Sequence, residues 1–211
     1  MQEVLKIDSQ RPDNSLIEEV SSILVAGGVV AYPTETFYGL GTDGQNEEAI
    51  RKIFLIKGRN FRNPISVIIG NANDVRGLVK EIPELALRLM EKFWPGALTI
   101  IFKASPHVSP ILTAGTGKIG IRLSSHPVAT ALAKKLGRPI TATSANLSGK
   151  QECTTADEVV QGIGDQIDAV LDGGQTPGGS GSTIIDVTTD PPAILREGVI
   201  RKHKLNDPAF L

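Results

Sequence analysis

The sequence of 211 residues contains very few aromatic and sulfur-containing side chains. Its single cysteine, Cys153, excludes a disulfide within the chain and a cysteine-built zinc site, and it fits a reducing, cytoplasmic compartment. Aromatic residues make up only 4% of the chain, which disfavours recognition of nucleic acid by stacking bases on aromatic platforms. The 22 Lys and Arg nearly balance the 23 Asp and Glu, so any site for anions must be local.

Long hydrophobic runs are also missing. No window approaches about 18 uncharged apolar residues, and the first residues, MQEVLKIDSQRPDN, lack the apolar core of a secretory signal. Helical and strand patterns alternate instead, which predicts an α/β domain with a mixed twisted sheet over residues 1–200 and a polar tail over 201–211. The predicted helices cover 15–26, 46–56, 73–81, 84–93, 127–136 and 155–163, and the predicted strands cover 29–32, 65–69, 98–103, 119–123, 140–144, 169–171, 183–187 and 193–196.

Helix-start signals accompany the first two predicted helices. Ser15 and Glu18 have the spacing of a capping box. Asn46 has the position of an N-cap, and the acidic residues Glu47 and Glu48 follow it in the first turn.

Glycine is abundant, with 22 residues, and it forms two motifs that resemble nucleotide-binding loops. Gly39, Gly41 and Gly44 match G-x-G-x-x-G, but no acidic residue follows about 20 positions later and residues 33–38 separate the predicted strand from the first glycine. A shaped loop is therefore favoured over a dinucleotide fingerprint. The run 173–181 has a serine where a P-loop needs its lysine, so a flexible loop is favoured, and a loop that folds onto an anion stays open.

Two polar stretches are candidates for a binding site. Lys57 and Arg59 follow the second predicted helix, and such a pair suits either a polyphosphate or the negative end of the helix itself. Ser144 and Asn146 follow a predicted strand, where ligands bind in open α/β sheets, although an ordinary turn is slightly favoured.

Other reactive side chains give no catalytic pattern. The three histidines fall in predicted loops or the tail, with no metal-ligand spacing, and are interpreted as surface residues: His107, His126 and His203. The acidic group Asp43, Glu47 and Glu48 could hold Mg²⁺, but helix capping explains the two glutamates better. The thiol of Cys153 is interpreted as inert, and no metal site built by the protein is predicted.

A set of motifs in a fixed order gives a more specific signal. They are YPTETFYGLG at 32–41, KGR at 57–59, NP at 63–64, FWPGALT at 93–99, IGIR at 119–122, SANLSG at 144–149, STIID at 182–186 and LREGVI at 195–200. Together, over roughly residues 10–200, they resemble the short, single-domain form of the YrdC-type threonylcarbamoyl-AMP synthase family. The resemblance implies a YrdC-like twisted mixed β-sheet with helices around a basic concave cleft.

The resemblance also implies an activity. L-Threonine, bicarbonate or CO₂, and ATP would give threonylcarbamoyl-AMP and pyrophosphate, with Mg²⁺ carried on ATP. The product would pass to tRNA threonylcarbamoyl transferase proteins that modify an adenosine of tRNA in the cytoplasm, and a weak contact with tRNA itself stays open. No membrane partner is implied. Because threonine and CO₂ form a carbamate without a protein nucleophile, such a site needs mainly positioning and charge neutralisation.

The family's functional residues map onto matching positions of this chain. The resemblance implies threonine contacts at Thr36, Arg122, Ala142 and Ser182. It implies ATP contacts at Lys57, Arg59, Asn63, Lys118, Ser144, Asn146 and Arg196. The residues implied to be catalytic are Lys57, Arg59, Ser144 and Asn146.

The chain also departs from the family's pattern. Ile68 stands where many members have a histidine near the threonine pocket, Asn60 replaces a common proline, and Phe37 replaces a smaller apolar residue. The run 151–153 differs from the usual Pro-Ser-Pro-like sequence, and the resemblance implies the form without the second domain of longer relatives. Two alternatives stay open: a module that binds structured RNA in the same cleft, and a paralogue that acts on another nucleotide or carbamoyl substrate.

Overall fold

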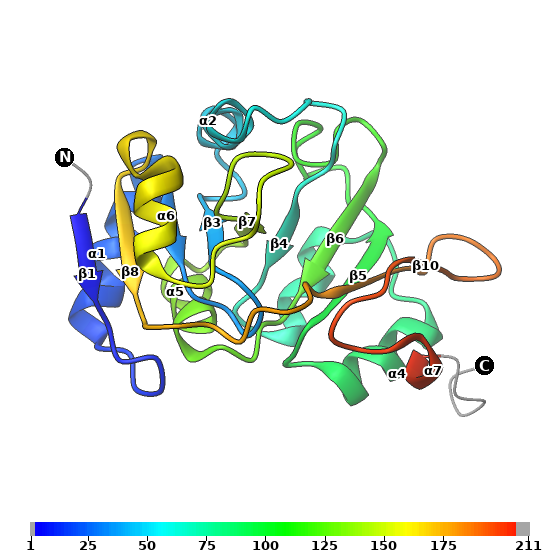
Figure 1. Ribbon diagram of the computed structural model, residues 1–211. Helices are drawn as coiled ribbons and strands as arrows, with labels where there is room; N and C mark the ends of the chain where they lie inside the picture. Colours follow the sequence, from blue (N-terminus) through cyan, green and yellow to red (C-terminus); the bar gives the residue numbers. More distant parts are fainter. Residues whose placement is uncertain (1–2, 206–211) are drawn as a thin grey trace.

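The computed structural model describes residues 3–205, which form one ten-stranded sheet with helices on both faces (Figure 1). The strands are β1 (Glu3–Lys6), β2 (Val30–Tyr32), β3 (Gly39–Gly41), β4 (Ser66–Ile68), β5 (Leu98–Lys103), β6 (Lys118–Arg122), β7 (Ile140–Ser144), β8 (Ala169–Asp172), β9 (Thr183–Asp186) and β10 (Ala193–Arg196). The α-helices are α1 (Asn14–Val25), α2 (Glu47–Lys57), α3 (Val75–Leu78), α4 (Glu84–Phe93), α5 (Pro127–Leu136), α6 (Ala156–Ile163) and α7 (Lys202–Leu205). Short 3₁₀ turns cover Ala72–Asp74 and Gly164–Gln166.

The strand order is β1-β8-β2-β3-β7-β4-β6-β5-β9-β10, with β1 and β10 at the two edges (Figure 1). The pairs β1–β8, β2–β8, β4–β6 and β5–β9 are parallel, and the other neighbours are antiparallel. The prediction of a mixed α/β sheet is confirmed. Strands far apart in the sequence become neighbours, so residues from many segments meet on one face.

The helices divide into two groups because side chains alternate between the two faces of each strand. On β2, Val30 and Tyr32 join one core with α1 and α5, and Ala31 joins the other core with α2 and α6. Residues of α3 and α4 belong to the second core as well. The first face therefore carries only two helices, and the part of it formed by β6, β5 and β9 is left to the site described below.

Strand β3 corrects the prediction that Gly39, Gly41 and Gly44 belong to a shaped loop. It pairs with both β2 and β7 near the middle of the sheet. A Cβ on Gly41 would lie 2.5 Å from the Tyr32 ring, and one on Gly39 would lie 3.0 Å from it. These glycines therefore make room for Tyr32, whose hydroxyl donates to Thr141 O at 2.8 Å. This confirms a structural role for the motif in place of a dinucleotide fingerprint.

Local signals predicted the helices unevenly. Asn46 caps α2 by accepting a hydrogen bond from Ala49 N, as predicted, and Gly58 ends the helix at φ 57°. The capping box at Ser15 is wrong, because the carboxylate of Asp13 accepts from the Ser15 amide and begins the helix earlier. The helix predicted over 73–81 shrinks to a 3₁₀ turn and the single turn of α3, and strand β1 was not predicted.

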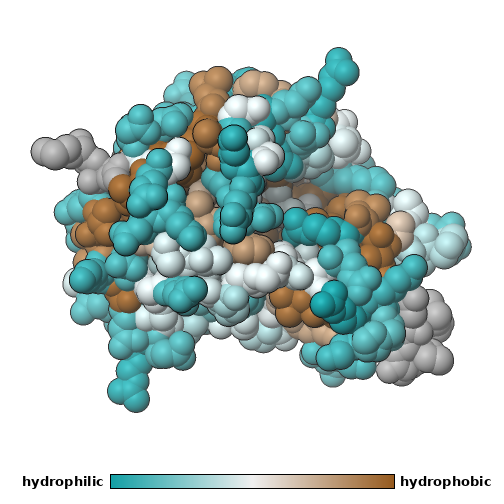
Figure 2. Space-filling view, in the orientation of Figure 1, coloured by the Kyte–Doolittle hydropathy of each residue, from teal (hydrophilic) through white to brown (hydrophobic). Residues whose placement is uncertain are grey.

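The ends of the chain and the surface add two observations. Within the predicted tail, Arg201 precedes α7, residues 202–205 form α7, and residues 206–211 lie outside the described residues. No helix within residues 3–205 is long and apolar enough to cross a membrane. Figure 2 shows hydrophobic residues reaching the viewed face in separate groups among hydrophilic side chains.

Candidate functional site

A pocket of about 220 Å³ is lined by residues of the segment between β2 and β3, of the loop after α2 and of strands β4, β5, β6, β7, β9 and β10. Seven of the predicted site residues line it: Thr36, Arg59, Arg122, Ala142, Ser144, Ser182 and Arg196. Sequence reasoning missed several other lining residues, among them Thr34, Ser66, Thr99, Thr143 and Glu152. Apart from the glutamate these additions are hydroxyl side chains, which offer both donors and acceptors of hydrogen bonds to a ligand.

Three arginines give the pocket its charge. They come from the loop after α2, the end of β6 and the end of β10: Arg59, Arg122 and Arg196. Glu152 is the one acid among the residues that line the pocket within the described chain. Burial lowers the pKa of Arg59, and burial followed by the cation of Arg122 lowers the pKa of Arg196. The pocket is thus a concentrated positive site, which fits an anionic ligand.

The position of Arg59 follows from the end of α2. Gly58 turns the chain through a left-handed conformation, after which Arg59 Nη2 donates to Pro64 O at 2.8 Å and Nη1 donates to Thr143 Oγ1 at 3.3 Å. The side chain is half-buried against the β7 end. These two bonds orient the guanidinium before any ligand binds.

The position of Arg196 depends on an irregularity in the last strand. The register of β10 shifts between Ile194 and Arg196, and the Arg196 side chain then reaches Ser182 through bonds of 2.9 Å to its carbonyl and 3.0 Å to its hydroxyl. Ser182 Oγ lies 2.9 Å from Thr99 Oγ1. A polar chain therefore crosses from β10 through β9 to β5 along one wall of the pocket.

The segment after Arg196 is tied down by Thr183. Its hydroxyl donates to Ile200 O at 2.6 Å and accepts from the amides of Gly198 and Ile200 at 2.9 and 3.1 Å. Gly198 packs so closely that a Cβ there would lie 2.0 Å from Gly181 O. Residues 196–200 are consequently fixed against β9, and this holds Arg196 at the pocket.

Lys57 lies behind the pocket and is not among the residues that line it. The side chain is buried, and Nζ donates to Ser144 O at 2.5 Å, Asn146 O at 2.7 Å and Asn146 Oδ1 at 3.1 Å. Ser144 Oγ donates to the same Asn146 Oδ1 at 2.6 Å. Burial, and then the neighbouring cation of Arg59, lowers the pKa of Lys57 to about 8. Lys57 therefore fixes the strand end that presents Ser144 to the pocket.

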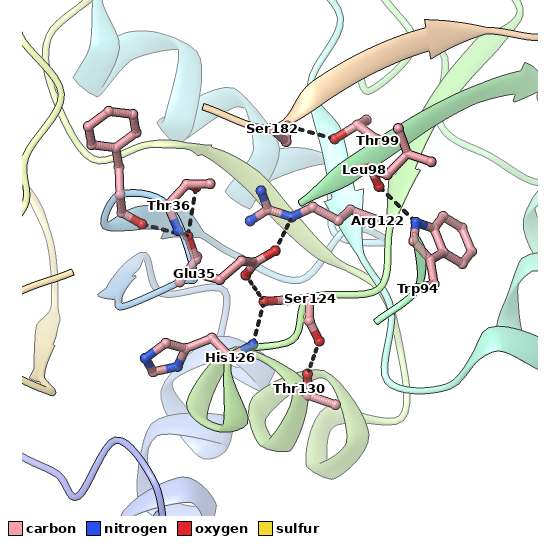
Figure 3. A network of polar contacts seen from close by, with 12 residues as sticks. Glu35, Thr36, Trp94, Leu98, Thr99, Arg122, Ser124, His126, Thr130 and Ser182 are labelled. Carbon is pink, nitrogen blue, oxygen red and sulfur yellow. Dashed lines mark hydrogen bonds and ion pairs between the residues drawn. The ribbon is translucent and has the colours of Figure 1, made fainter. Parts of the chain in front are cut away.

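The surroundings of Arg122 are shown in Figure 3. Glu35 Oε1 faces Arg122 Nε at 3.7 Å, and Ser124 Oγ donates a hydrogen bond to Glu35 Oε2. Sequence reasoning missed Glu35. Its one available signal is that it is the only acid between residues 33 and 42, inside a segment flanked by apolar residues and threonines.

Four predicted positions lie outside the pocket lining: Lys57 and Asn146, described above, and Asn63 and Lys118. Asn63 is exposed in the turn before Pro64. Lys118 lies at the other end of β6 from Arg122 and pairs with Asp186 at 2.9 Å. Ile68, where the resemblance implies a histidine in many members, is fully buried in the core under α5. The roles implied for Asn63 and Lys118 stay predictions.

The other reactive side chains considered in the sequence do not line the pocket. Asp43 is buried and paired with Arg138. Cys153 is buried, its thiol donates to Ala145 O at 3.2 Å, and burial raises its pKa. His107 and His203 are exposed as predicted, but His126 is half-buried because its ring accepts from Val128 N and caps α5. Within residues 3–205 no group of three or more His, Cys, Asp or Glu side chains could hold a metal ion.

Comparisons with known proteins agree with this geometry. Residues 22–198 match the model of the Sua5/YciO/YrdC family, which is described as telomere recombination. The chain is 41% identical over 94% of its length to the threonylcarbamoyl-AMP synthase of Bacillus subtilis (strain 168) and 39% identical over 90% to that of Pyrococcus abyssi (strain GE5 / Orsay). It spans only 58% and 56% of the length of these two relatives.

Solved structures give the same result. The crystal structure of P. abyssi Sua5 complexed with L-threonine superposes with a TM-score of 0.93 and 36% identity, over 96% of this chain and 59% of that one. The crystal structure of E. coli YciO superposes with a TM-score of 0.87 and 30% identity, over 94% of this chain and 97% of that one. The family match, the shared fold and the pocket at the same motifs lead to one conclusion. The chain belongs to the Sua5/YciO/YrdC family.

Proposed function

We propose that this chain is an L-threonylcarbamoyladenylate synthase, which forms threonylcarbamoyl-AMP and pyrophosphate from L-threonine, bicarbonate or CO₂, and ATP. The observation that carries the proposal is the convergence of Arg59, Arg122 and Arg196 with several hydroxyl side chains in one pocket. A site of this composition suits two anionic substrates, an amino acid and a triphosphate. The names of the relatives support the same activity.

The two substrates divide the pocket between them. The amino-acid carboxylate binds the guanidinium of Arg122, which can donate two parallel hydrogen bonds. Thr36, Ala142 and Ser182 line the space around that carboxylate, and the threonine hydroxyl pairs with one of the hydroxyl side chains there. The triphosphate binds Arg59 and Arg196, whose cations stand on different elements of the pocket wall.

The reaction needs no nucleophile from the protein. The amine nitrogen of threonine attacks the carbon of CO₂ and releases a proton to solvent, which gives a carbamate. From bicarbonate, the carbon–hydroxyl bond breaks and the hydroxide leaves together with the amine proton as one water molecule. A carbamate oxygen then attacks the α-phosphorus of ATP, the bond to the bridging oxygen breaks, and pyrophosphate leaves with the electron pair. Arg59 and Arg196 stabilise the negative charge that builds up on the phosphates, and Ser144 lies beside them on the strand end that Lys57 fixes.

Mg²⁺ enters this proposal as a companion of ATP. The described residues do not fit a resident metal centre, since they contain no cluster of His, Cys, Asp or Glu that could hold one. Mg²⁺ is commonly bound by phosphate oxygens and water. We place the activity in the cytoplasm, with the product passed to tRNA threonylcarbamoyl transferase proteins.

The deciding experiment measures pyrophosphate release by the purified chain with ATP, bicarbonate and each of the twenty amino acids. We expect release that depends on threonine and on bicarbonate, and mass spectrometry should find threonylcarbamoyl-AMP. Release with another amino acid, or none with any, would count against the proposal and favour a paralogue with a different substrate. A salt titration of tRNA binding tests the RNA-binding alternative, which requires tight, strongly salt-dependent binding without turnover.

A further inference from the structure

Glu35 is a partly buried acid that lies beside the pocket without lining it. It lies in the segment between β2 and β3, where its neighbours Thr34 and Thr36 line the pocket. Its own side chain turns the other way, to a position between Arg122 and Ser124 (Figure 3). Only 15% of the side chain is exposed. A carboxylate so far removed from water needs compensation by a partner.

The compensation that Glu35 receives is incomplete. Oε2 accepts the hydrogen bond from Ser124 Oγ, but Oε1 stands 3.7 Å from Arg122 Nε, beyond hydrogen-bonding distance. Within residues 3–205, neither Glu35 Oε1 nor Arg122 Nε has any hydrogen-bond partner. Charge-assisted bonds between such groups usually close to about 2.7–2.9 Å. The two charges therefore face each other as an ion pair that is not bonded.

The geometry divides the guanidinium into two edges. Its planar fork offers Nε–H along one side and the two terminal nitrogens at the end, and either edge can receive a carboxylate. Glu35 stands at the Nε edge, and the terminal nitrogens extend away from it toward the side of Thr36 (Figure 3). An anion that reaches Arg122 from the pocket thus meets the terminal nitrogens.

Ser124 holds Glu35 in this place, and α5 in turn holds Ser124. The hydroxyl of Ser124 also accepts from His126 N at 3.1 Å, and its carbonyl accepts from Thr130 Oγ1 at 2.8 Å. Ser124 is therefore fixed to the first turn of α5, which packs in the core with α1. The segment carrying Thr36 is connected by this route to the element that follows Arg122.

We propose that Glu35 is a positioning residue for the amino-acid substrate. It occupies the Nε edge of Arg122, fixes the direction of the fork, and leaves the two terminal nitrogens for the substrate carboxylate. Ser124 supports it by holding its second oxygen. This inference rests on the proposed function, because it assigns to Arg122 the carboxylate of the amino acid.

The test compares two variants with a matched control. Glu35→Gln keeps the size of the side chain but removes its charge, and Ser124→Ala keeps the charge but removes the supporting hydroxyl. The control Glu18→Gln removes one carboxylate from an exposed ion pair with Lys135, which joins α1 to α5 away from the pocket lining. Threonine affinity is measured by calorimetry, and the KM values for threonine and ATP are measured by pyrophosphate release, with the melting temperature of each variant.

We expect Glu35→Gln to weaken threonine binding at least about tenfold, or about 1.4 kcal/mol, while the KM for ATP stays within about twofold. Ser124→Ala should act in the same direction to a smaller extent, and Glu18→Gln should leave both KM values unchanged. If Glu35→Gln does not fold, Ser124→Ala provides the comparison.

Three results would overturn the inference. Unchanged threonine affinity with a lower melting temperature would show a purely structural acid, and tighter binding would show that Glu35 competes with the substrate for Arg122. If the unsubstituted protein binds no threonine, the proposed function and this assignment fail together. If it binds threonine and only the variants behave otherwise than expected, the inference alone fails.

Discussion

Lys57→Met should remove most of the activity while changing the stability of the fold little. The free energy of unfolding contains two opposing contributions at this position. The fall of the Lys57 pKa from 10.5 to about 8 means that burying the ammonium form costs about 3 kcal/mol more than burying the neutral amine. An uncharged side chain of similar length removes that cost.

The opposing contribution is a loss of stability, because the substitution removes the hydrogen bonds from Lys57 to three oxygens. Asn146 Oδ1 keeps the donor Ser144 Oγ, and Ser144 O keeps the donor Asn146 N at 3.0 Å, so mainly Asn146 O is left without its partner. One buried unsatisfied acceptor costs about 1–3 kcal/mol. The two contributions leave a net stabilisation of about 0 to 2 kcal/mol, which is at most about 8 °C in melting temperature for a chain of this size.

Activity should respond far more strongly, because Ser144 is presented to the pocket by the strand end that Lys57 fixes. Arg59 also donates to Thr143 of this strand end, so a shift of the end displaces a guanidinium that donates to the phosphates. Loss of one preorganised donor typically lowers turnover by about 10²- to 10³-fold, and we expect a fall of about 10²-fold in pyrophosphate release. Lys52→Met is the matched control, since Lys52 also belongs to α2 but donates at 2.8 Å to Gly27 O, away from the pocket. Activity of Lys57→Met within about threefold of the unsubstituted protein would refute this reasoning. So would a fall of more than about 10 °C in melting temperature.

Three other predictions follow from the same geometry. Arg122→Lys removes the fork, so calorimetry should show threonine binding weaker by about 10- to 100-fold, and equal affinity would contradict the assignment. Activity should decline as the pH rises through about 8, because neutral Lys57 has two N–H groups for three oxygens; a profile flat to pH 9.5 would contradict this. Gly198→Ala places a Cβ 2.0 Å from Gly181 O, so we expect a stability loss of about 1–3 kcal/mol by denaturant unfolding and a higher KM for ATP through Arg196. Gly162→Ala, which has open space around it in α6, should stabilise slightly, and equal effects of the two changes would contradict the steric argument.

Local patterns predicted most of the helices and strands, but not strands β1 and β3 and not how far each element extends. The Asn46 cap and the Gly58 terminus could be predicted because both act within a few residues of themselves. Strand β3 could not be predicted, because a segment with two glycines has little intrinsic preference for the strand conformation. It forms a strand because β2 and β7 pair with it and the Tyr32 ring packs over its glycines. The same limit applies to β1, which is short and forms the edge of the sheet beside β8.

For the site, too, the sequence predicted part of the arrangement, and the rest depends on tertiary contacts. The motifs indicated which residues matter, and seven of the predicted positions line one pocket. They could not indicate that Lys57 bonds to protein oxygens, because that depends on β7 ending beside α2. Nor could they give the partner of Arg122, since Glu35 reaches it only after the parallel and antiparallel pairings bring two distant loops together.

The position of Arg196 at the end of the last strand, β10, has a consequence for the synthesis of the protein. Arg196 reaches the pocket from the last strand, while Thr36 comes from one of the first loops. During synthesis, a nascent chain of 180 residues already carries Arg59 and Arg122 but lacks Ser182 and Arg196. Binding competence must therefore arise near the end of translation, after β9 has paired with β5 and β10 with β9. Premature termination before β10 would leave a partly assembled sheet with an electropositive hollow that lacks one wall.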